Sequence, residues 1–283
     1  MKSIQEAVEA KDFSVLWPMM VEWLELNSYA GGKLSPHTLR SYKKGVECYL
    51  EDCGPILSAT PKSMKLWRNA LVEKGLCAKS VSLRMIAVKQ FYKALHDNGF
   101  EDLRPFNGVR APRDPTPSWE KREAYSEEEV AKLLEFARPQ DRLLILLCGH
   151  AGLRISEALG LSWNKIDLKT RKLTVIGKGR KQRTVPLSRT LVGVLEGMER
   201  SEGTLVGYKT QRNAYVRIQR LCVAAGVPMR GLHSLRHYAG TKIMRATNSL
   251  ENVARMLGHA NLEMARTYAK WTDEGLKDAV AAW

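Results

Sequence analysis

The sequence predicts a mainly α-helical protein, in which an N-terminal helical bundle precedes a mixed α+β domain with a small antiparallel hairpin. Three observations support this fold class. Apolar residues recur at helical spacing in several segments, two expected helices begin with a capping residue followed by proline, and one stretch reads as two strands around a glycine-rich turn. Prolines are concentrated between residues 104 and 119, which predicts a linker between a domain of residues 1–103 and one of residues 120–283.

Four helices are expected in the first domain. The first covers about 17–26, and the pairs Ser35-Pro36 and Thr60-Pro61 begin the second and third, because each supplies a side-chain cap before a proline at the first helical position. The fourth runs from about 79 to 96 and buries one stripe of apolar side chains at intervals of four and three. That stripe consists of Val81, Met85, Val88, Tyr92 and Leu95.

The second domain begins with a helix that Ser126 and Glu129 cap reciprocally. A buried helix ending in glycine follows in DRLLILLCGHAG, and LRISEALG then forms a short helix that leads to a strand. The stretch 172–187 predicts the hairpin, with KLTVI and QRTVPL as strands on either side of the turn GKGRK. Only helices are expected after it, the last of them at about 273–283.

The protein carries a net charge of +15 at neutral pH, with a calculated isoelectric point of about 9.7. The excess is uneven: residues 119–283 hold 28 basic and 17 acidic side chains, whereas residues 1–118 hold 17 and 13. A strongly basic protein usually binds a polyanion. The sequence shows no signal peptide and no apolar run long enough for a bilayer, and its five cysteines lack metal-ligand spacing, so a cytoplasmic protein with reduced thiols is expected.

The segment HSLRH contains two histidines four residues apart with an arginine between them. On a helix, His233, Arg236 and His237 share one face. A zinc helix of the HExxH type requires a glutamate at the second position, which here is Ser234, and the permanent charge of Arg236 opposes a cation. One guanidinium and two imidazoles suit an anion such as phosphate. On this segment alone, a solvated basic surface helix is an equally good interpretation.

Five short motifs follow one another along the second domain: AGLRISE with Arg154, IGKGRKQR with Lys178, HSLRH, LGHAN with His259, and ARTYAK with Tyr268. Each is weak alone, because arginines at helix ends and lysines on hairpin tips are common. In this order and spacing they resemble the tyrosine recombinase (phage integrase) family, with the layout of its Xer-like members. The resemblance covers the whole chain and implies a SAM-like helical core-binding domain, a linker and a catalytic domain.

The resemblance implies a site-specific DNA recombinase that cuts and rejoins DNA through a 3′-phosphotyrosyl intermediate, without metal, ATP or another cofactor. Tyr268 would be the nucleophile. It needs positive surroundings, because a free phenol has a pKa of about 10 and is a poor nucleophile at neutral pH. Arg154 and Arg236 would stabilise the negative charge that develops on the phosphate.

Three further positions complete the catalytic set that the resemblance implies. His233 would act as acid and base at the nucleophile, His259 would donate a hydrogen bond to the phosphate, and Lys178 would protonate the leaving 5′ oxygen. Glu157 lies three residues after Arg154 on the same helical face. It could orient a catalytic side chain, although a capping or surface role is equally expected.

Two neighbours in the HSLRH helix are assigned supporting roles. His237 is expected to stabilise the fold around the site. Tyr238, the rival nucleophile, falls one residue past the shared face and is expected to pack in the interior.

The residues that contact DNA are less clearly marked. Five basic side chains of the first domain could contact phosphates, although a solvated side chain is equally expected at each: Arg40, Lys43, Lys44, Arg84 and Lys89. Beside the hairpin tip, three more are expected to follow the DNA backbone: Arg180, Lys181 and Arg183. In the family, a helix before the HSLRH segment approaches the major groove, which adds Arg212, Arg217 and Arg220.

The expected partners are a double-stranded DNA recombination site and other copies of the chain. The resemblance implies a tetramer in the synaptic complex, in which the terminal helix of each protomer docks into a neighbour. An accessory directionality factor and a role in a mobile element are compatible with this layout. Two alternatives stay open: a type IB topoisomerase-like enzyme that relaxes DNA without strand exchange, and a non-catalytic DNA-binding protein.

Overall fold

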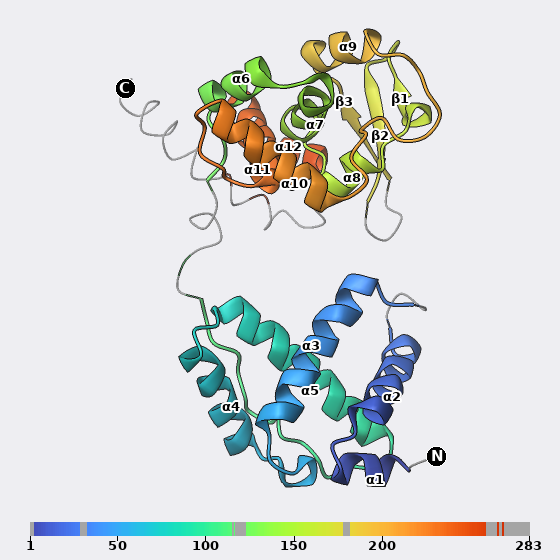
Figure 1. Ribbon diagram of the computed structural model, residues 1–283, viewed down its shortest axis with the longest axis vertical. Helices are drawn as coiled ribbons and strands as arrows, with labels where there is room; N and C mark the ends of the chain where they lie inside the picture. The colour runs from blue at the N-terminus through green and yellow to red at the C-terminus, as the bar shows by residue number, and fades with distance from the viewer. Residues whose placement is uncertain are drawn as a thin grey trace. The chain divides into compact units, whose positions relative to one another are not determined.

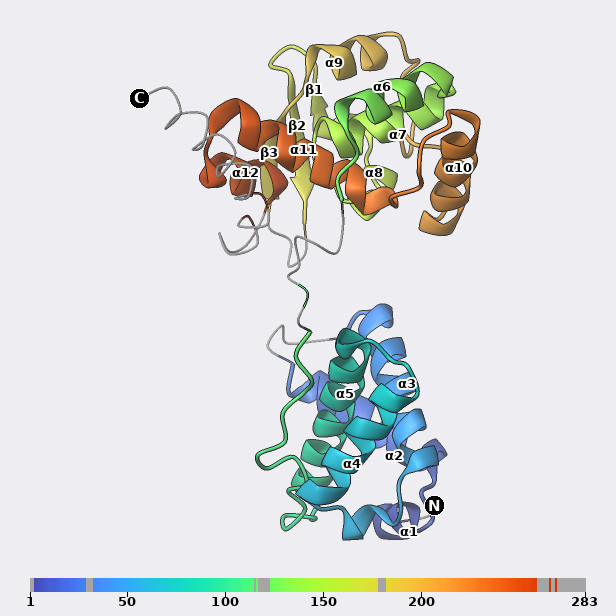
Figure 2. The same cartoon turned by 90° about the vertical axis from the view of Figure 1, so that its left-hand side faces the viewer.

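Residues 3–28, 33–114, 116, 123–177, 182–258, 265 and 268 are described by the computed structural model. The chain divides into two units, Met1–Pro115 and Thr116–Trp283 (Figure 1). Helices dominate both units, and the strands of the described residues belong to one small sheet in the second unit (Figure 2). The predicted fold class is confirmed.

The described residues of the first unit form five α-helices, with a 3₁₀ turn at Ile56–Ser58. They are α1 (Ile4–Glu9), α2 (Phe13–Leu26), α3 (Pro36–Asp52), α4 (Pro61–Glu73) and α5 (Ala78–Asp97). The side chains of Ser35 and Thr60 accept hydrogen bonds from the backbone N–H groups of Thr38 and Ser63, as expected of helix caps. Helix α5 packs against α2, α3 and α4 and buries its predicted apolar stripe.

Helices α3 and α5 cross at close range because a glycine lies at the crossing. A Cβ atom added to Gly45 would lie 2.7 Å from the Cβ atom of Ala87, closer than packed carbon atoms approach each other. One turn further along α3, the hydroxyls of the buried Tyr49 and Tyr92 form a hydrogen bond of 2.5 Å. The basic side chains expected to contact DNA therefore lie on two helices that pack directly together: Arg40, Lys43 and Lys44 on α3, and Arg84 and Lys89 on α5.

The beginning of the proline-rich stretch packs on the first unit. Leu103, Phe106 and Val109 lie against its hydrophobic core, and Nη1 of Arg68 on α4 donates a hydrogen bond of 3.0 Å to the carbonyl oxygen of Arg110. Residues 104–110, which the sequence assigns to the linker, are thus held in place by their apolar side chains.

The described residues of the second unit form seven α-helices and a three-stranded antiparallel sheet. The helices are α6 (Glu127–Phe136), α7 (Pro139–Gly149), α8 (Ile155–Leu159), α9 (Arg189–Glu196), α10 (Gln211–Ala224), α11 (Leu232–Thr247) and α12 (Leu250–Leu257). The strands are β1 (Ile166–Asp167), β2 (Lys172–Ile176) and β3 (Gln182–Pro186). Strands β2 and β3 form the expected hairpin, with Leu173 paired to Val185 and Val175 paired to Arg183. No helix within the described ranges combines the length and apolar composition needed to cross a bilayer.

Helix α7 is the centre of the second unit's core. Its residues from Leu143 to Gly149 are all buried, and it contacts α6, α8, α9 and α11 (Figures 1 and 2). Tyr238 on α11 is 6% exposed and lies beside His150 at the end of α7, which confirms that Tyr238 packs in the interior. Because other elements hold α7 on several sides, the segment that follows it and carries Arg154 starts from a fixed position.

A buried ion pair ties α7 to α10. Asp141 is fully buried, and its carboxylate accepts hydrogen bonds of 2.8 to 3.2 Å from Nε and Nη2 of Arg217. The hydroxyl of Tyr208 donates to the same carboxylate. Every polar atom of this buried carboxylate therefore has a partner, which is the condition for an interior charge to be tolerated.

We expect Asp141→Ala to lower the free energy of unfolding by about 3–5 kcal/mol, because the partly buried charge of Arg217 would lose its carboxylate. Urea denaturation measures the change, with Glu135→Ala on the exposed side of α6 as the control. A loss no larger than that of the control would show that the pair does not stabilise the unit.

Candidate active site

The segment that joins α7 to α8 turns at a glycine and then presents Arg154. Gly152 has a φ of +64°, and a Cβ atom there would lie 2.6 Å from a side-chain carbon of Leu257. This close approach brings the end of α12 against the start of α8. Arg154 immediately precedes α8, and its backbone N–H donates a hydrogen bond of 2.8 Å to the carboxylate of Glu157.

The carboxylate of Glu157 is the negative centre of the site. It also accepts a hydrogen bond from Nη1 of Arg154 (2.9 Å) and two from Arg183 (2.8 and 3.0 Å), and Nη1 of Arg236 lies 3.9 Å away. Burial by itself would raise the pKa of this 7% exposed side chain. The hydrogen bonds from Arg183 and from Arg154, together with their charges, outweigh burial and lower the pKa of Glu157 to about 2. Glu157 thus both caps α8 and orients the guanidinium of Arg154.

Arg236 joins α11 to both neighbouring segments. Its side chain is 3% exposed, with Nη1 donating to the carbonyl oxygen of Gly152 and Nη2 to that of Leu257, both at 2.5 Å. Burial and the positive charge of Arg154 lower the pKa of Arg236 to about 10, which leaves the guanidinium charged at neutral pH. The charged guanidiniums of Arg154 and Arg236 therefore both lie beside Glu157, at the beginning of α8.

Tyr268 lies against the face of α11 that carries the two histidines. Its hydroxyl is 3.0 Å from Nδ1 of His237, and the ring of His233 stands edge-on to that of His237 with centroids 4.9 Å apart. Tyr268 is 4% exposed, and burial raises its pKa to about 12 against the opposing effect of Arg236. The phenol therefore stays protonated at neutral pH in this position.

The ring of Tyr268 rests on α11 where a glycine leaves room for it. A Cβ atom on Gly240 would lie 2.4 Å from Cζ of Tyr268 and 2.8 Å from its hydroxyl oxygen. Sequence reasoning missed this position. The signal was present, because a glycine inside a helix costs about 1 kcal/mol relative to alanine and commonly has a packing reason.

The structure brings several predicted site residues together. The charge of Arg154 lowers the pKa of Arg236, the charge of Arg236 opposes the rise in the pKa of Tyr268, and His233 joins this group through its ring contact with His237. Four predicted residues lie outside the described residues: Lys178, Arg180, Lys181 and His259. Within the ranges that the structure describes, no three His, Cys, Asp or Glu side chains are grouped closely enough to hold a metal ion.

Two arginines expected at DNA are instead bound to buried carboxylates. The side chains of Arg183 and Arg217 are 12% and 24% exposed, whereas Arg212 and Arg220 on α10 are exposed residues. For Arg183, the alternation of side chains along β3 could have predicted that it faces inward. Val185 is buried, so Arg183, two residues earlier on the same strand, faces the interior as well.

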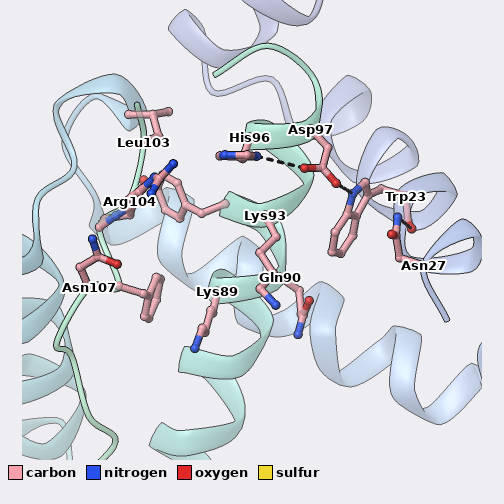
Figure 3. Close-up of a pocket in the computed structure, with 13 residues that line it drawn as sticks. Trp23, Asn27, Lys89, Gln90, Lys93, His96, Asp97, Leu103, Arg104 and Asn107 are labelled. Atoms are coloured by element: carbon pink, nitrogen blue, oxygen red, sulfur yellow. Dashed lines mark hydrogen bonds and ion pairs between the residues drawn. The ribbon is translucent and has the colours of Figure 1, made fainter. Parts of the chain in front are cut away.

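In the first unit, one predicted DNA-contact residue lines a cavity. The cavity has a volume of about 630 Å³ and lies along α5, with Lys89, Lys93 and Arg104 among the side chains that line it (Figure 3). The acidic residue among the lining side chains, Asp97, accepts a hydrogen bond of 2.7 Å from the indole N–H of Trp23. Basic groups therefore prevail at this hollow, which suits contact with an anion.

Comparison with known proteins relates both units to one family. The phage integrase family matches residues 123–274, and the phage integrase N-terminal SAM-like domain matches residues 29–99. Tyrosine recombinase XerC of Haemophilus influenzae (strain 86-028NP) is 28% identical over 260 residues, covering 83% of this chain and 87% of the relative. XerC of Xanthomonas campestris pv. campestris (strain B100) is also 28% identical, covering 83% of this chain and 79% of the relative.

Solved structures share the fold at lower identity. The XerH site-specific recombinase bound to palindromic difH substrate is 19% identical, with a TM-score of 0.70 over 93% of this chain and 84% of that chain. A lambda integrase dimer bound to a COC′ core site is 16% identical, with a TM-score of 0.72 over 89% of this chain and 96% of that chain.

We expect Glu157→Gln to lower the free energy of unfolding at pH 7 by on the order of 3 kcal/mol, because folding depresses the pKa of Glu157 from 4.5 to about 2. A depressed pKa contributes stability that is present above pH 4.5 and is lost as the pH falls toward 2. The difference between wild type and variant should therefore shrink over that range in urea denaturation at a series of pH values. A difference that does not depend on pH would contradict an ionised Glu157.

We expect Gly240→Ala to displace the ring of Tyr268 and expose it. Nitration of Tyr268 by tetranitromethane, mapped by mass spectrometry, should become several times faster. The control is Gly193→Ala, at a helical glycine of α9 with open space around its Cβ position. Equal nitration of Tyr268 in both variants would show that its ring does not depend on the space at Gly240.

Proposed function

This chain belongs to the phage integrase family and is a tyrosine-type site-specific DNA recombinase, and we propose that Tyr268 is its nucleophile and that Arg154 and Arg236 bind the scissile phosphate. The observation that carries this proposal is that the guanidiniums of Arg154 and Arg236 both lie within 4 Å of the carboxylate of Glu157. The charge of Arg236 also acts on the phenol of Tyr268, whose pKa it lowers against the effect of burial. With Arg183 included, three guanidiniums surround one carboxylate. The resulting net positive charge attracts a phosphodiester.

Cleavage begins when the oxygen of Tyr268 attacks the phosphorus, forming a tyrosyl ester while the bond to the 5′ oxygen breaks. One strand end then carries a 3′-phosphotyrosyl link and the other a free 5′ hydroxyl. Arg154 and Arg236 stabilise the negative charge on the non-bridging oxygens. Lys178 gives a proton to the leaving oxygen, and His259 donates a hydrogen bond to the phosphate.

The phenol has to leave its resting contact with His237 before it attacks. In that contact it is buried, with its pKa raised to about 12. Movement toward a phosphate held by the arginines would relieve burial and bring the oxygen nearer to positive charge, and both changes lower its pKa. His233 is exposed and in ring contact with His237, and we assign it the role of accepting the phenolic proton.

The phosphotyrosyl ester conserves the energy of the broken bond, so a hydroxyl of a partner strand can reverse the step without ATP or a metal ion. A lambda integrase of this fold has been crystallised as a tetramer bound to a Holliday junction. We propose that this chain likewise acts as a tetramer on double-stranded DNA in the cytoplasm, with its terminal segment (about 273–283) docking into a neighbouring protomer. An accessory directionality factor would act on this assembly.

Covalent trapping tests the assignment of the nucleophile. Wild type and Tyr268→Phe are each mixed with sheared DNA from the source organism in the presence of EDTA, denatured, and examined for DNA that stays attached. We expect the wild type alone to retain DNA, at a recurrent sequence, because the variant keeps the ring and lacks the attacking oxygen.

Other outcomes favour the two alternatives. Relaxation of any supercoiled plasmid, without a recurrent attachment sequence, would indicate a type IB topoisomerase-like enzyme. DNA that is bound equally by both proteins under native conditions and attached to neither after denaturation would indicate a non-catalytic DNA-binding protein.

A further inference from the structure

We propose that Arg183 is a positioning residue of the cleavage site, which locks strand β3 to the start of α8 and to the end of α12. Through these two anchors it fixes the guanidinium of Arg154 and the backbone that leads to His259. The inference rests on the proposed function, because it concerns residues that act on the scissile phosphate. It assigns Arg183 a role different from the DNA-backbone contact that the sequence suggests.

The first anchor is a bidentate ion pair with Glu157. Nη1 of Arg183 lies 3.0 Å from Oε1 of Glu157, and Nη2 lies 2.8 Å from Oε2. The same two oxygens accept the side-chain and backbone hydrogen bonds of Arg154. Arg154 is therefore oriented by a carboxylate whose own orientation Arg183 fixes. With side-chain exposures of 12% for Arg183 and 7% for Glu157, water screens this pair only weakly.

The second anchor is the C-terminal end of α12. Nε of Arg183 donates a hydrogen bond of 3.3 Å to the carbonyl oxygen of Met256, and Nη2 of Arg236 donates to the next carbonyl, that of Leu257. The last carbonyl groups of a helix have no partner within the helix and carry partial negative charge. Arg183 and Arg236 thus hold two successive carbonyls of the helix that ends just before His259.

The glycine that ends α12 leaves space for this contact. Gly258 has a φ of +65°, and a Cβ atom there would lie 2.6 Å from Cδ of Arg183 and 3.0 Å from its Nε. A side chain at residue 258 would push Arg183 away from Met256. Gly258 therefore serves both the left-handed end of the helix and the close approach of the arginine.

The geometry requires arginine and does not favour a phosphate contact. Each of the three guanidinium nitrogens of Arg183 has a protein acceptor, at Met256 or at Glu157. A lysine has one nitrogen and could not form the paired hydrogen bonds to both carboxylate oxygens while reaching the carbonyl. Arg183 also faces the interior of the unit on the same side of β3 as Val185. A DNA phosphate would have to break these contacts to reach it.

Two readouts on the full-length protein test the proposal. Arg183→Met removes the guanidinium and retains an aliphatic chain against Gly258, and Arg183→Lys retains the charge. The matched control is Lys172→Met, which removes an exposed charge from the neighbouring strand. The first readout is amide hydrogen exchange by mass spectrometry over residues 153–159 and 253–258. The second compares affinity for a short random-sequence duplex, over a range of salt concentrations, with the rate of covalent trapping.

We expect Arg183→Met to accelerate exchange in both segments and to slow covalent trapping by about 100-fold, because small displacements of positioned groups cost about that much. Loss of the Arg183 charge should weaken DNA affinity only slightly, and the slope of its salt dependence should remain that of the wild type, because Arg183 makes no phosphate contact. Arg183→Lys should recover little of the covalent-trapping rate, because the single nitrogen of lysine cannot form the paired hydrogen bonds that the guanidinium makes. If Arg183→Met does not fold, faster exchange in the same two segments of Arg183→Lys carries the test.

Unchanged exchange in both segments would overturn the proposal. A second pattern of results in Arg183→Met would also overturn it. DNA affinity would fall, the slope of log affinity against log salt concentration would decrease by about one, and the trapping rate at saturating DNA would not change. These results together would indicate a phosphate contact. Failure of the proposed function is a separate result: wild type itself would then attach no DNA, whereas the exchange measurement would still decide whether Arg183 anchors α8 and α12.

Discussion

The second unit depends on one buried carboxylate that holds three guanidiniums from three different elements. Glu157 on α8 meets Arg154 at the start of its own helix, Arg183 on β3 and, at 3.9 Å, Arg236 on α11. Without the carboxylate, these like charges would repel each other in a region where two of the three side chains are nearly buried. With it, they are fixed close together and still leave an excess of positive charge. A site built to receive a phosphodiester needs this balance, because the charge must be held in place before the anion arrives.

Backbone groups complete this frame. Arg236 donates to the carbonyl oxygens of Gly152 and Leu257, and Arg183 donates to that of Met256, so the turn before α8 and the end of α12 are joined by charged hydrogen bonds. Tyr268, the proposed nucleophile, lies beside this frame and is held by other contacts. Tyr268 lies buried on the glycine of α11, and the pKa of about 12 keeps its phenol protonated. In the proposed mechanism, a phenol that is buried and protonated would not attack phosphodiesters outside a properly bound site.

Much of the fold could be predicted because its elements obey local rules. Short stretches of chain are enough to predict these elements. Examples are the caps Ser35, Thr60 and Ser126, the apolar stripe of α5 and the alternation of buried and exposed residues in the hairpin. The sequence does not predict α1, which has only six residues and too few apolar positions to show a period. It assigns residues 104–110 to the linker because they begin a stretch, residues 104–119, that holds four prolines. Phe106 and Val109 nevertheless pack against the hydrophobic core of the first unit, and this tertiary contact overrides the local signal.

The order and spacing of five motifs determined, from the sequence alone, the family and the identity of the candidate catalytic residues. Tertiary structure decided which of the basic residues pair with buried carboxylates. Arg183 and Arg217 cannot be told from solvated arginines by their neighbours along the chain, because their partners, Glu157 and Asp141, lie 26 and 76 residues away. The same holds for His237, which bonds to Tyr268 across 31 residues, and for Gly240, whose missing side chain makes room for that ring. Local periodicity reports which face of an element is buried, whereas the partner of a buried charge depends on how separate elements pack.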